Sequence, residues 1–372
     1  MKPAIVVVTY NRVGSLKRLL SSLAAADYRE RDGIPLIISV DKSDTESCAG
    51  AAEDFSWEHG EKRVIRRDER LGLKRHILEC GALSEEYGAV VMLEDDLMVS
   101  PCFYEYAVQA LQFSEKYPNI GGISLYRHRF QVFARLPFEA IEDGFDNWYF
   151  RLPSSWGQAW SADQWKGFSD WLSVHDGEEV AGTGIPSFVS AWGESSWLKY
   201  AVRYLVETDK YFLYPRLSYT TNFADEGEHA SHTVTDLQVP LSRGGDAFRF
   251  SSPEESKAVY DAYFENERLG AEADLYGIKY ADTKGRKLSP KGELLLSTKS
   301  LSFKVAKTYA LAMKPMDANV VWDLPGEGIF LYDLKESAPP PKIKSGRLED
   351  YFYPGMSMKK ILQLLKYRLF KA

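Results

Sequence analysis

The chain has 372 residues, of which 45% are hydrophobic and 13% aromatic, which allows a large buried core and excludes wholesale disorder. Its net charge of -7 at pH 7 argues against broad nucleic-acid binding, and its three scattered cysteines lack zinc-ligand spacing and fit a reducing compartment. The opening MKPAIVVVTY is typical of a strand and not of a signal peptide, and no apolar run approaches about 18 residues, so we expect a cytoplasmic protein.

The first part of the chain alternates between strand and helix patterns. Continuous apolar, β-branched runs predict strands buried on both faces of a sheet, at Ala4–Thr9, Pro35–Val40, Arg63–Arg66 and Ala89–Leu93. Apolar residues at helical spacing predict helices after Asn11-Arg12, around residues 44–54, over Lys74–Glu86 and from Pro101 onward. This alternation predicts an α/β fold with an open, mostly parallel sheet flanked by helices.

Polar residues stand where three of these strands end, at Thr9, at Asp41 and at the triplet Glu94-Asp95-Asp96. Ligands of open α/β sheets bind beyond the carboxyl ends of the strands. Three adjacent carboxylates after a buried strand repel one another, and burying them without a positive partner is costly. A divalent cation such as Mg²⁺ or Mn²⁺ answers that need, because it takes one or two carboxylates plus phosphate oxygens. The plain alternative is an acidic surface turn.

The rest of the chain divides by composition. Residues 119–235 are dense in aromatic side chains, most of which we expect in the core, while Trp156 and Trp160 stand in loop-like sequence and are candidates to contact a sugar. Residues 236–372 carry glycines, charges, short strand patterns such as GIKYAD and GIFLYDL, and a basic tail. We therefore predict one large domain over 1–235, with halves meeting near residue 118, and a C-terminal extension over 236–372.

Several cations surround Gly72, directly before the predicted helix at Lys74–Glu86. A helix N-terminus with cations beside it suits a diphosphate. A charge run is more often only a solvated face, so single residues carry little weight. The best candidates for a phosphate contact are Arg70, Lys74 and Arg75.

Three of these features together resemble a known family. The run TYNR from Thr9, the strand-end Asp41 and the EDD triplet are similar to inverting, metal-dependent glycosyltransferases of family 2 type with the GT-A fold. Within that superfamily, LEDDLMVSPCFYEY resembles the segment around the EDD motif of N-acetylglucosaminyltransferase I. The resemblance spans about residues 3–235 and covers nothing beyond about 240.

The resemblance implies roles for individual residues. Asp96 is expected to ligate Mn²⁺ or Mg²⁺ on the diphosphate of the sugar donor, and Asp95 and Glu94 to contact ribose, metal-bound water or the donor sugar. Asp41 is expected to hydrogen-bond the base, most often uracil. The same likeness implies nucleotide contacts for Thr9 and Arg12, whereas the loop-like sequence around Trp156 and Trp160 is what places them near donor or acceptor.

Transfer with inversion also needs a base outside the triplet. The tryptophan-flanked acid of the resembled family matches Glu194 in Trp192–Trp197, although this chain has a serine where the family has a second aspartate. The alternatives are Asp163, Asp225 and Glu226, or a merely helix-capping role for Glu194. His229 and His232 have a spacing that also permits metal binding, but a phosphate or structural role suits them at least as well.

The last fifteen residues, Met358–Ala372, contain five Lys or Arg residues and no acid. As a helix, this segment places Met358, Ile361, Leu362, Leu365 and Leu369 on one face and most of its cations on the other. It is too short and too charged to span a bilayer but suits an anionic membrane surface. The alternative is a helix docked on the enzyme or on the second copy of a homodimer.

These observations predict an enzyme that moves a sugar from a nucleotide sugar, UDP-linked by the resemblance, to a saccharide or lipid-linked saccharide. The expected setting is bacterial surface glycan synthesis, such as capsule or lipopolysaccharide, at the inner membrane face. A nucleotidyltransferase is one alternative, but the first strand is not followed by the glycine-rich loop that such enzymes usually carry. A sugar-binding scaffold with a degenerate transferase fold is the other.

Overall fold

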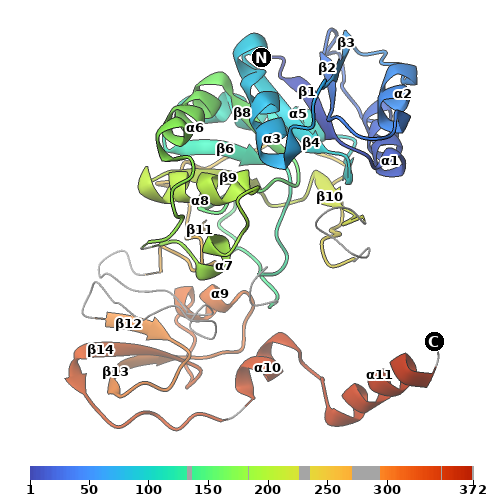
Figure 1. Cartoon of the computed structure of the whole chain (residues 1–372). Coiled ribbons are helices and arrows are strands. Elements are labelled where there is room, and N and C mark those ends of the chain that lie inside the picture. Colours follow the sequence, from blue (N-terminus) through green and yellow to red (C-terminus); the bar gives the residue numbers. More distant parts are fainter. Residues whose placement is uncertain (132–135, 183, 226–234, 270–293, 345, 371–372) are drawn as a thin grey trace. The chain divides into compact units, whose positions relative to one another are not determined.

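The computed structural model describes residues 1–131, 136–182, 184–225, 235–269, 294–344 and 346–370. The chain forms two compact units, and each is described by itself (Figure 1). Unit 1 comprises Met1–His128 and Glu142–Phe264, and unit 2 comprises Arg129–Ile141 and Glu265–Ala372. Residues 236–264, which the sequence analysis grouped with the extension, thus fold within unit 1.

Unit 1 is built around one large sheet. Its strands are β1 (Ala4–Thr9), β2 (Leu36–Val40), β3 (Lys62–Arg66), β4 (Ala89–Glu94), β6 (Ile120–Ser124), β7 (Asn147–Phe150), β8 (Gln158–Ser161), β9 (Tyr211–Pro215) and β11 (Val259–Tyr260). In the described residues their order is β11-β7-β9-β6-β8-β4-β1-β2-β3. The four strands β4, β1, β2 and β3 are parallel, and β8 runs antiparallel between β4 and β6. The expected mostly parallel sheet is confirmed, with β8 reversed in its middle and β7 and β11 reversed at one end.

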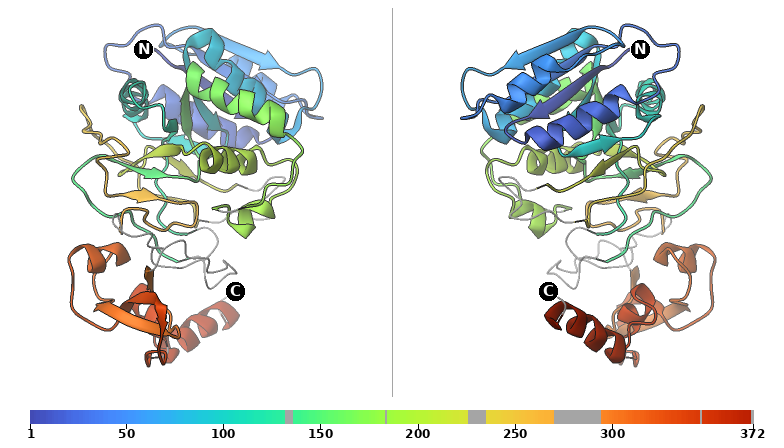
Figure 2. Two further views of the ribbon diagram at one scale, coloured as in Figure 1. Left: turned by 90° about the vertical axis from the view of Figure 1, so that its left-hand side faces the viewer. Right: turned by 90° about the vertical axis from the view of Figure 1, so that its right-hand side faces the viewer.

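Helices cover both faces of this sheet, as the two opposite views of Figure 2 show. They are α1 (Val13–Ala24), α2 (Ser47–Asp54), α3 (Gly72–Ala82), α4 (Ser84–Tyr87), α5 (Phe103–Ser114), α6 (Ala162–His175), α7 (Ser187–Ser190) and α8 (Trp197–Glu207). Helices α1, α2 and α5 share one hydrophobic core with alternate residues of β1, β2 and β4. Helices α3, α6 and α8 pack together, and α3 and α6 also contact the sheet. Because successive side chains of the central strands point to opposite faces of the sheet, these strands contribute to the hydrophobic core on each face.

Two predicted helices begin at other residues than expected, for local reasons. The pattern Lys74–Glu86 forms α3 and α4, and α3 begins at Gly72 because the backbone N–H groups of Leu71 and Gly72 donate to the carboxylate of Asp41. Helix α5 begins at Phe103 and not at Pro101, because the backbone N–H of Cys102 donates to the hydroxyl of Ser100 and forms a turn first.

A small two-stranded sheet completes the edge of unit 1 at which β4 ends. Its strands are β5 (Leu97–Val99), directly after the triplet, and β10 (Thr220–Asn222). They are antiparallel, with Asn222 opposite Leu97, and the backbone N–H of Phe223 donates to the carbonyl of Asp96 at 3.0 Å. This pairing carries a segment more than a hundred residues away to the acidic triplet.

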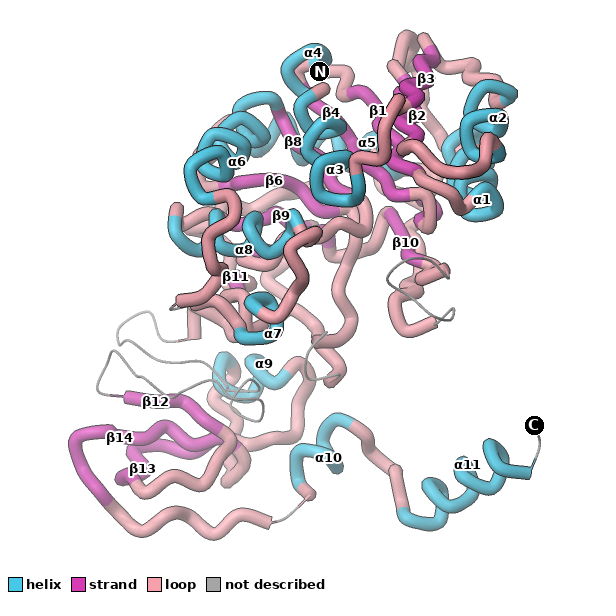
Figure 3. Tube along the Cα trace, viewed as in Figure 1, coloured by secondary structure: helices cyan, strands magenta, loops and turns pink. Residues whose placement is uncertain are grey.

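Unit 2 contains an antiparallel sheet of order β12-β14-β13 in its described residues (Figure 3). Its elements are β12 (Leu294–Ser297), β13 (Phe303–Tyr309), β14 (Ile329–Ser337), α9 (Met316–Val321), α10 (Arg347–Phe352) and α11 (Met358–Phe370). One of its cores joins Leu296, Met316, Ile329 and Tyr351. The strand pattern GIKYAD lies outside the described residues. Across the described part of the chain, every helix is too short or too polar to cross a membrane.

Candidate active site

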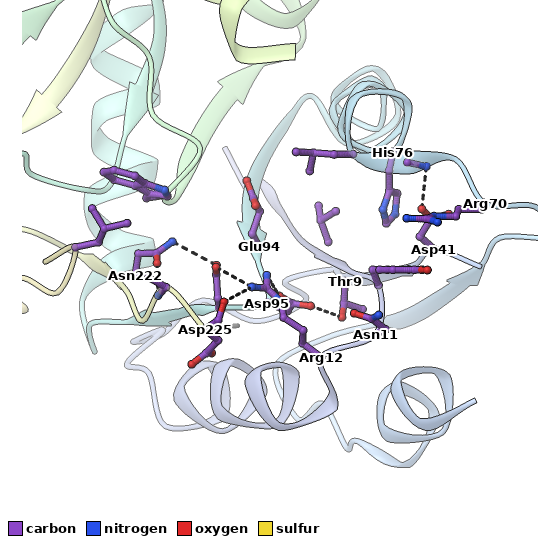
Figure 4. A pocket seen from close by; sticks show the side chains of 18 residues that line it. Thr9, Asn11, Arg12, Asp41, Arg70, His76, Glu94, Asp95, Asn222 and Asp225 are labelled. Atoms are coloured by element: carbon purple, nitrogen blue, oxygen red, sulfur yellow. Dashed lines mark hydrogen bonds and ion pairs between the residues drawn. The ribbon is translucent and has the colours of Figure 1, made fainter. Parts of the chain in front are cut away.

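A pocket lies at the carboxyl ends of β1, β2 and β4 in unit 1 (Figure 4). It is where the sequence analysis expected three polar strand ends to meet. Eight of the predicted residues line it, namely Thr9, Arg12, Asp41, Arg70, Glu94, Asp95, Asp96 and Trp156. They are joined by others that include Tyr10, Asn11, His76, Asn222 and Asp225.

Arg12 supplies the positive charge that the carboxylate triplet requires. Its guanidinium forms an ion pair with Asp95 and a second one with Oδ2 of Asp96, at 3.1 Å from Nη1. The hydroxyl of Thr9 donates to the other oxygen of Asp95 at 2.7 Å. Figure 4 shows the side chains of Thr9, Arg12 and Asp95 pointing toward one another. Asp95 is only 2% exposed, so its charge is held almost entirely by protein groups.

The electrostatics of the triplet follow from this arrangement. Burial lowers the pKa of the Arg12 guanidinium, but the nearby charges of Asp95 and Asp96 outweigh it, so the net shift is upward. Burial, together with the charge of Asp96, raises the pKa of Glu94 to about 8 in the absence of a cation. Glu94 is therefore mostly protonated at neutral pH, which reduces the repulsion within the triplet.

The segment after β10 closes one side of the pocket. Asn222 Nδ2 donates to Oδ1 of Asp96 at 3.4 Å. The carboxylate of Asp225 accepts from the hydroxyl of Ser15 at 2.6 Å and pairs with Arg18. Burial alone would raise the pKa of Asp225, but the bonds from Arg18 and Ser15 lower it below its usual value. Asp225 is therefore a stable anion in the pocket wall.

The other side of the pocket is formed by Asp41 and α3. The Asp41 carboxylate accepts from Leu71 N at 2.8 Å and from Gly72 N at 3.0 Å, so it holds the first turn of α3. Ring Nε2 of His76 and the hydroxyl of Ser39 share a hydrogen bond of 2.8 Å. Burial lowers the pKa of His76 to about 4, so this ring is neutral at physiological pH.

Trp156 is fixed in the pocket wall by its own backbone and by the glycine that follows it. The hydroxyl of Thr220 in β10 donates to the carbonyl of Trp156 at 2.6 Å. Gly157 has φ +95°, and a Cβ there would lie 2.5 Å from the Thr220 methyl group, so only glycine fits this close approach. The strand pairing that positions Asn222 thus also positions Trp156.

Four predicted residues do not line this pocket, and one of them, Trp160, is fully buried in strand β8 and not in a loop. Arg75 is exposed and pairs with Glu69 and Glu79. Lys74 pairs with Asp176 and lies 4.3 Å from the centre of the Tyr200 ring in α8. The side chain of Glu194 is 85% exposed and pairs with Lys199 at 2.9 Å.

A series of contacts nevertheless connects Glu194 to the pocket. Lys199 lies 5.2 Å from the centre of the same Tyr200 ring that Lys74 contacts, and Lys74 stands in the first turn of α3, whose Gly72 lines the pocket. Among the alternatives for the base, Asp225 lines the pocket, while Asp163 lines a different hollow beside α6. Glu226, His229 and His232 lie outside the described residues.

The chemistry of the donor set fits a divalent cation of the Mg²⁺ or Mn²⁺ kind. The described residues contain no cluster of three His, Cys, Asp or Glu side chains that would enclose a metal ion by itself. The pocket instead offers carboxylate oxygens, chiefly those of Asp96, whereas the amide oxygen of Asn222 already accepts from the backbone N–H of Ala224 at 2.5 Å. Mg²⁺ is commonly bound in this way, by one or two carboxylates with the remaining positions left to phosphate and water.

Comparison with known proteins identifies the domain. Residues 4–153 match the family model described as glycosyl transferase family 2. This part of the chain therefore resembles glycosyl transferase family 2, which supports a glycosyltransferase domain. The match includes both Thr9 and the EDD triplet, and unit 1, with its large sheet between two helix layers, has the GT-A fold. No curated protein matches the chain. The particular similarity to N-acetylglucosaminyltransferase I stays a prediction.

Several solved structures resemble the chain at low identity. TarS from S. aureus, in complex with UDP-GlcNAc, has 13% identity and a TM-score of 0.37, with 62% of this chain and 60% of that chain covered. The mannosyltransferase PcManGT from Pyrobaculum calidifontis, in complex with GDP-Man and Mn²⁺, has 14% identity and a TM-score of 0.38, with 58% and 55% covered. GalNAc-T7 with UDP, GalNAc and Mn²⁺ has 13% identity and a TM-score of 0.40, with 57% and 42% covered. This chain thus spans at most about 60% of the length of these proteins.

Several residues of this pocket were not predicted from the sequence, among them His76 and Asn222. His76 lies in the middle of α3, where a histidine in a helical pattern indicates nothing about a site. Asn222 follows two threonines in a short strand, and only its pairing with β5 brings it to Asp96. Neither residue had a local signal, because both reach the pocket through contacts between distant segments.

Proposed function

We propose that this protein is a metal-dependent, inverting glycosyltransferase that transfers a sugar from a UDP-sugar to a saccharide acceptor. The main support for this proposal is the position of Asp96. It lies beside Arg12 and Asn222 in a pocket that also contains Asp41, within a domain that resembles glycosyl transferase family 2. Binding of a nucleotide sugar requires three kinds of group: a carboxylate for the metal ion, a cation for the diphosphate and a polar strand end for the nucleotide base.

The reaction is a single displacement. An acceptor hydroxyl oxygen forms a bond to the anomeric carbon, the bond from that carbon to the diphosphate breaks, and the electron pair leaves with UDP. A bound Mn²⁺ or Mg²⁺ would be held by Asp96 and would neutralise charge on the departing diphosphate. The hydroxyl proton goes to a carboxylate base, which must be unprotonated and free to receive it.

Glu194 is the proposed base. Its carboxylate is mostly exposed, and a single lysine contacts it. The carboxylate of Asp225 is closer to the pocket centre but is already bonded to Ser15 and Arg18, and its lowered pKa makes it a weaker base. Glu194→Ala should leave donor binding unchanged and reduce transfer between about 100-fold and 10,000-fold. Normal transfer by this variant, with loss in Asp225→Asn, would reassign the base to Asp225.

The donor is tested by calorimetric titration of the full chain with UDP-, GDP- and dTDP-sugars, with Mn²⁺ and with a chelator. Binding of UDP-sugars that disappears with the chelator is the expected result. Binding to a nucleoside triphosphate and a sugar phosphate, with release of pyrophosphate, would support a nucleotidyltransferase instead. Absence of binding to every nucleotide sugar would leave a sugar-binding scaffold as the better interpretation.

Helix α11 supports an acceptor at a membrane surface. It carries exposed leucines at 362, 365 and 369, with exposed lysines at 359, 360 and 366. Apolar side chains beside cations suit an anionic lipid surface. Leu364 is also exposed, on the side of the helix that carries the lysines, so the two faces are less separated than the sequence pattern suggested. We propose peripheral membrane association, with a lipid-linked saccharide of a bacterial surface glycan as acceptor.

Co-sedimentation with vesicles tests this association. The full chain should bind vesicles that contain anionic lipid, and removal of Met358–Ala372 should abolish binding while donor binding stays unchanged. Replacing Lys359, Lys360 and Lys366 by Gln should weaken binding to anionic vesicles alone. Equal binding by the full and shortened chains would favour a docked helix, and a change in molar mass on shortening would favour a homodimer.

A further inference from the structure

Arg12 neutralises the same carboxylates that the proposed metal site needs. Its Nη1 lies 3.1 Å from Oδ2 of Asp96 and its Nη2 pairs with Asp95. Nη1 also donates to the backbone carbonyl of Asp225 at 3.4 Å. One guanidinium therefore joins β4 to the segment after β10 across the pocket.

The alternatives for balancing these charges are weak within the described residues. Asp95 retains one further donor, the Thr9 hydroxyl, and Asp96 has only the long contact from Asn222. Both are neutral groups and cannot cancel a charge. Arg18, the next arginine on α1, pairs with Asp225 and lies 3.9 Å from the Phe223 ring centre, without a bond to the triplet. Arg12 is therefore the cation that balances the buried carboxylates.

The position of Arg12 disfavours the binding of a second cation beside Asp96. The guanidinium and a divalent ion repel each other, and both are attracted to the oxygens of Asp96. A guanidinium binds phosphate oxygens as well as carboxylates, frequently in a bidentate manner. A diphosphate entering the pocket would give Arg12 a new anionic partner and would release Asp96 for the metal ion.

We propose that Arg12 makes metal binding depend on the donor diphosphate. In the empty pocket Arg12 competes with the cation for Asp96, and the diphosphate removes this competition. Metal and nucleotide then enhance each other's binding by the same factor, as linkage requires. The inference rests on the proposed function, because it assigns Arg12 a role toward the metal and diphosphate of that same pocket. Arg12 is thus a positioning residue for the metal ligand.

The experiment measures Mn²⁺ affinity by calorimetry in the full chain, without UDP and with saturating UDP. In the parent, Mn²⁺ alone should bind weakly and UDP should strengthen it strongly. Arg12→Gln should bind Mn²⁺ alone at least about tenfold more tightly, because the competing cation is gone. The factor by which UDP strengthens Mn²⁺ binding should fall by about the same amount. Mn²⁺ should also raise the melting temperature of Arg12→Gln more than that of the parent.

Two further variants serve as controls. Arg18→Gln removes a nearby arginine that forms an ion pair without touching the triplet, and its Mn²⁺ affinity should equal that of the parent. Arg12→Lys keeps a charge but cannot bridge Asp95, Asp96 and the Asp225 carbonyl together, so its Mn²⁺ affinity should lie between parent and Arg12→Gln. If Arg12→Gln fails to fold, the Mn²⁺ affinity of Arg12→Lys still tests the role of Arg12.

The outcomes separate the two proposals. Unchanged or weaker Mn²⁺ binding by both Arg12 variants overturns the role given to Arg12, whatever UDP does. Equal gains in Arg12→Gln and Arg18→Gln would indicate a general charge effect and would also overturn it. Failure of the parent to bind any UDP-sugar with Mn²⁺ instead overturns the proposed donor, and the affinity for Mn²⁺ alone still decides the role of Arg12.

Discussion

Trp156 contacts two polar sites that differ in how their buried groups are satisfied. It lines the pocket that contains Asp95 and Asp96, where both carboxylates pair with Arg12 and Asp95 also accepts from the Thr9 hydroxyl. Its ring also lies 5.5 Å from the ring of His128, centre to centre. Neither ring nitrogen of His128 has a hydrogen-bond partner in the described part of the chain.

His128 is enclosed by aromatic rings. It is 4% exposed, and in the described part of the chain rings within about 6 Å of it include those of Tyr126, Phe150, Trp156, Tyr214 and Phe264. Burial lowers the pKa of His128 to about 3, so the imidazole is neutral. An unpaired buried polar group typically costs about 1–3 kcal/mol.

The contrast between the carboxylate pocket and His128 indicates which buried polar groups a fold tolerates without hydrogen-bond or ion-pair partners. A carboxylate at this depth needs partners, a cation for Asp95 and Asp96 and two backbone N–H groups for Asp41, because an unpaired buried charge is far more costly than a neutral dipole. A histidine can lose its proton and remain. We therefore expect changes in the pocket to affect ligand binding first, and changes around His128 to affect stability first.

The largest expected effect is the loss of donor binding in Asp96→Ala. We expect metal-dependent affinity for a UDP-sugar to fall at least roughly 100-fold, about 2.7 kcal/mol, because the principal oxygen ligand is gone. The melting temperature should change little, since Arg12 keeps Asp95 as its partner. Calorimetry measures the affinity. Asp246→Ala, which removes an exposed carboxylate paired with Arg29, is the control and should bind normally. Parent-like affinity of Asp96→Ala for the UDP-sugar would show that this pocket is not the donor site.

The second effect concerns pH and His128→Phe. Because the pKa of His128 is lower in the folded chain than in the unfolded chain, the unfolded chain binds more protons as pH falls below about 6.5. Stability is therefore full above pH 6.5 and should be about 2 kcal/mol lower at pH 5 through this residue alone. Between pH 8 and pH 5, chemical denaturation should show a change in stability that is about 2 kcal/mol less favourable in the parent than in His128→Phe.

Other groups contribute equally in the parent and in His128→Phe: the lowered pKa of His76, about 4, reduces stability at pH 5, and the raised pKa of Glu94, about 8, increases it. Donor binding at pH 7.5 should be that of the parent, which would separate the two sites. A parent-like fall in stability between pH 8 and pH 5 in this variant would contradict the explanation.

The smallest effect is expected for Thr9→Val, which lies inside the charged cluster. Removing the hydroxyl leaves one oxygen of the buried Asp95 without its donor, and stability should fall by about 1.5 kcal/mol. Thr9→Ser retains the hydroxyl and should be closer to the parent. Urea denaturation at pH 7.5 measures both. Equal stability of Thr9→Val and the parent would show that Arg12 alone suffices for Asp95.

The sequence by itself determined the fold class and much of the pocket. Apolar runs that end in Thr9, Asp41 and the EDD triplet are local patterns, and parallel strands bring their carboxyl ends to one edge. The need for a positive partner was also evident, because three adjacent carboxylates cannot be buried alone.

Only the tertiary structure decided which groups meet those strand ends. Arg12 supplies the charge, Asn222 and Asp225 arrive through the pairing of β5 with β10, and Glu194 lies on the surface beside Lys199. His128 has no sequence signal for its aromatic enclosure. The reason is physical: strand and helix periods depend on neighbours in the chain, whereas the partners of a buried charge are set by how distant segments pack.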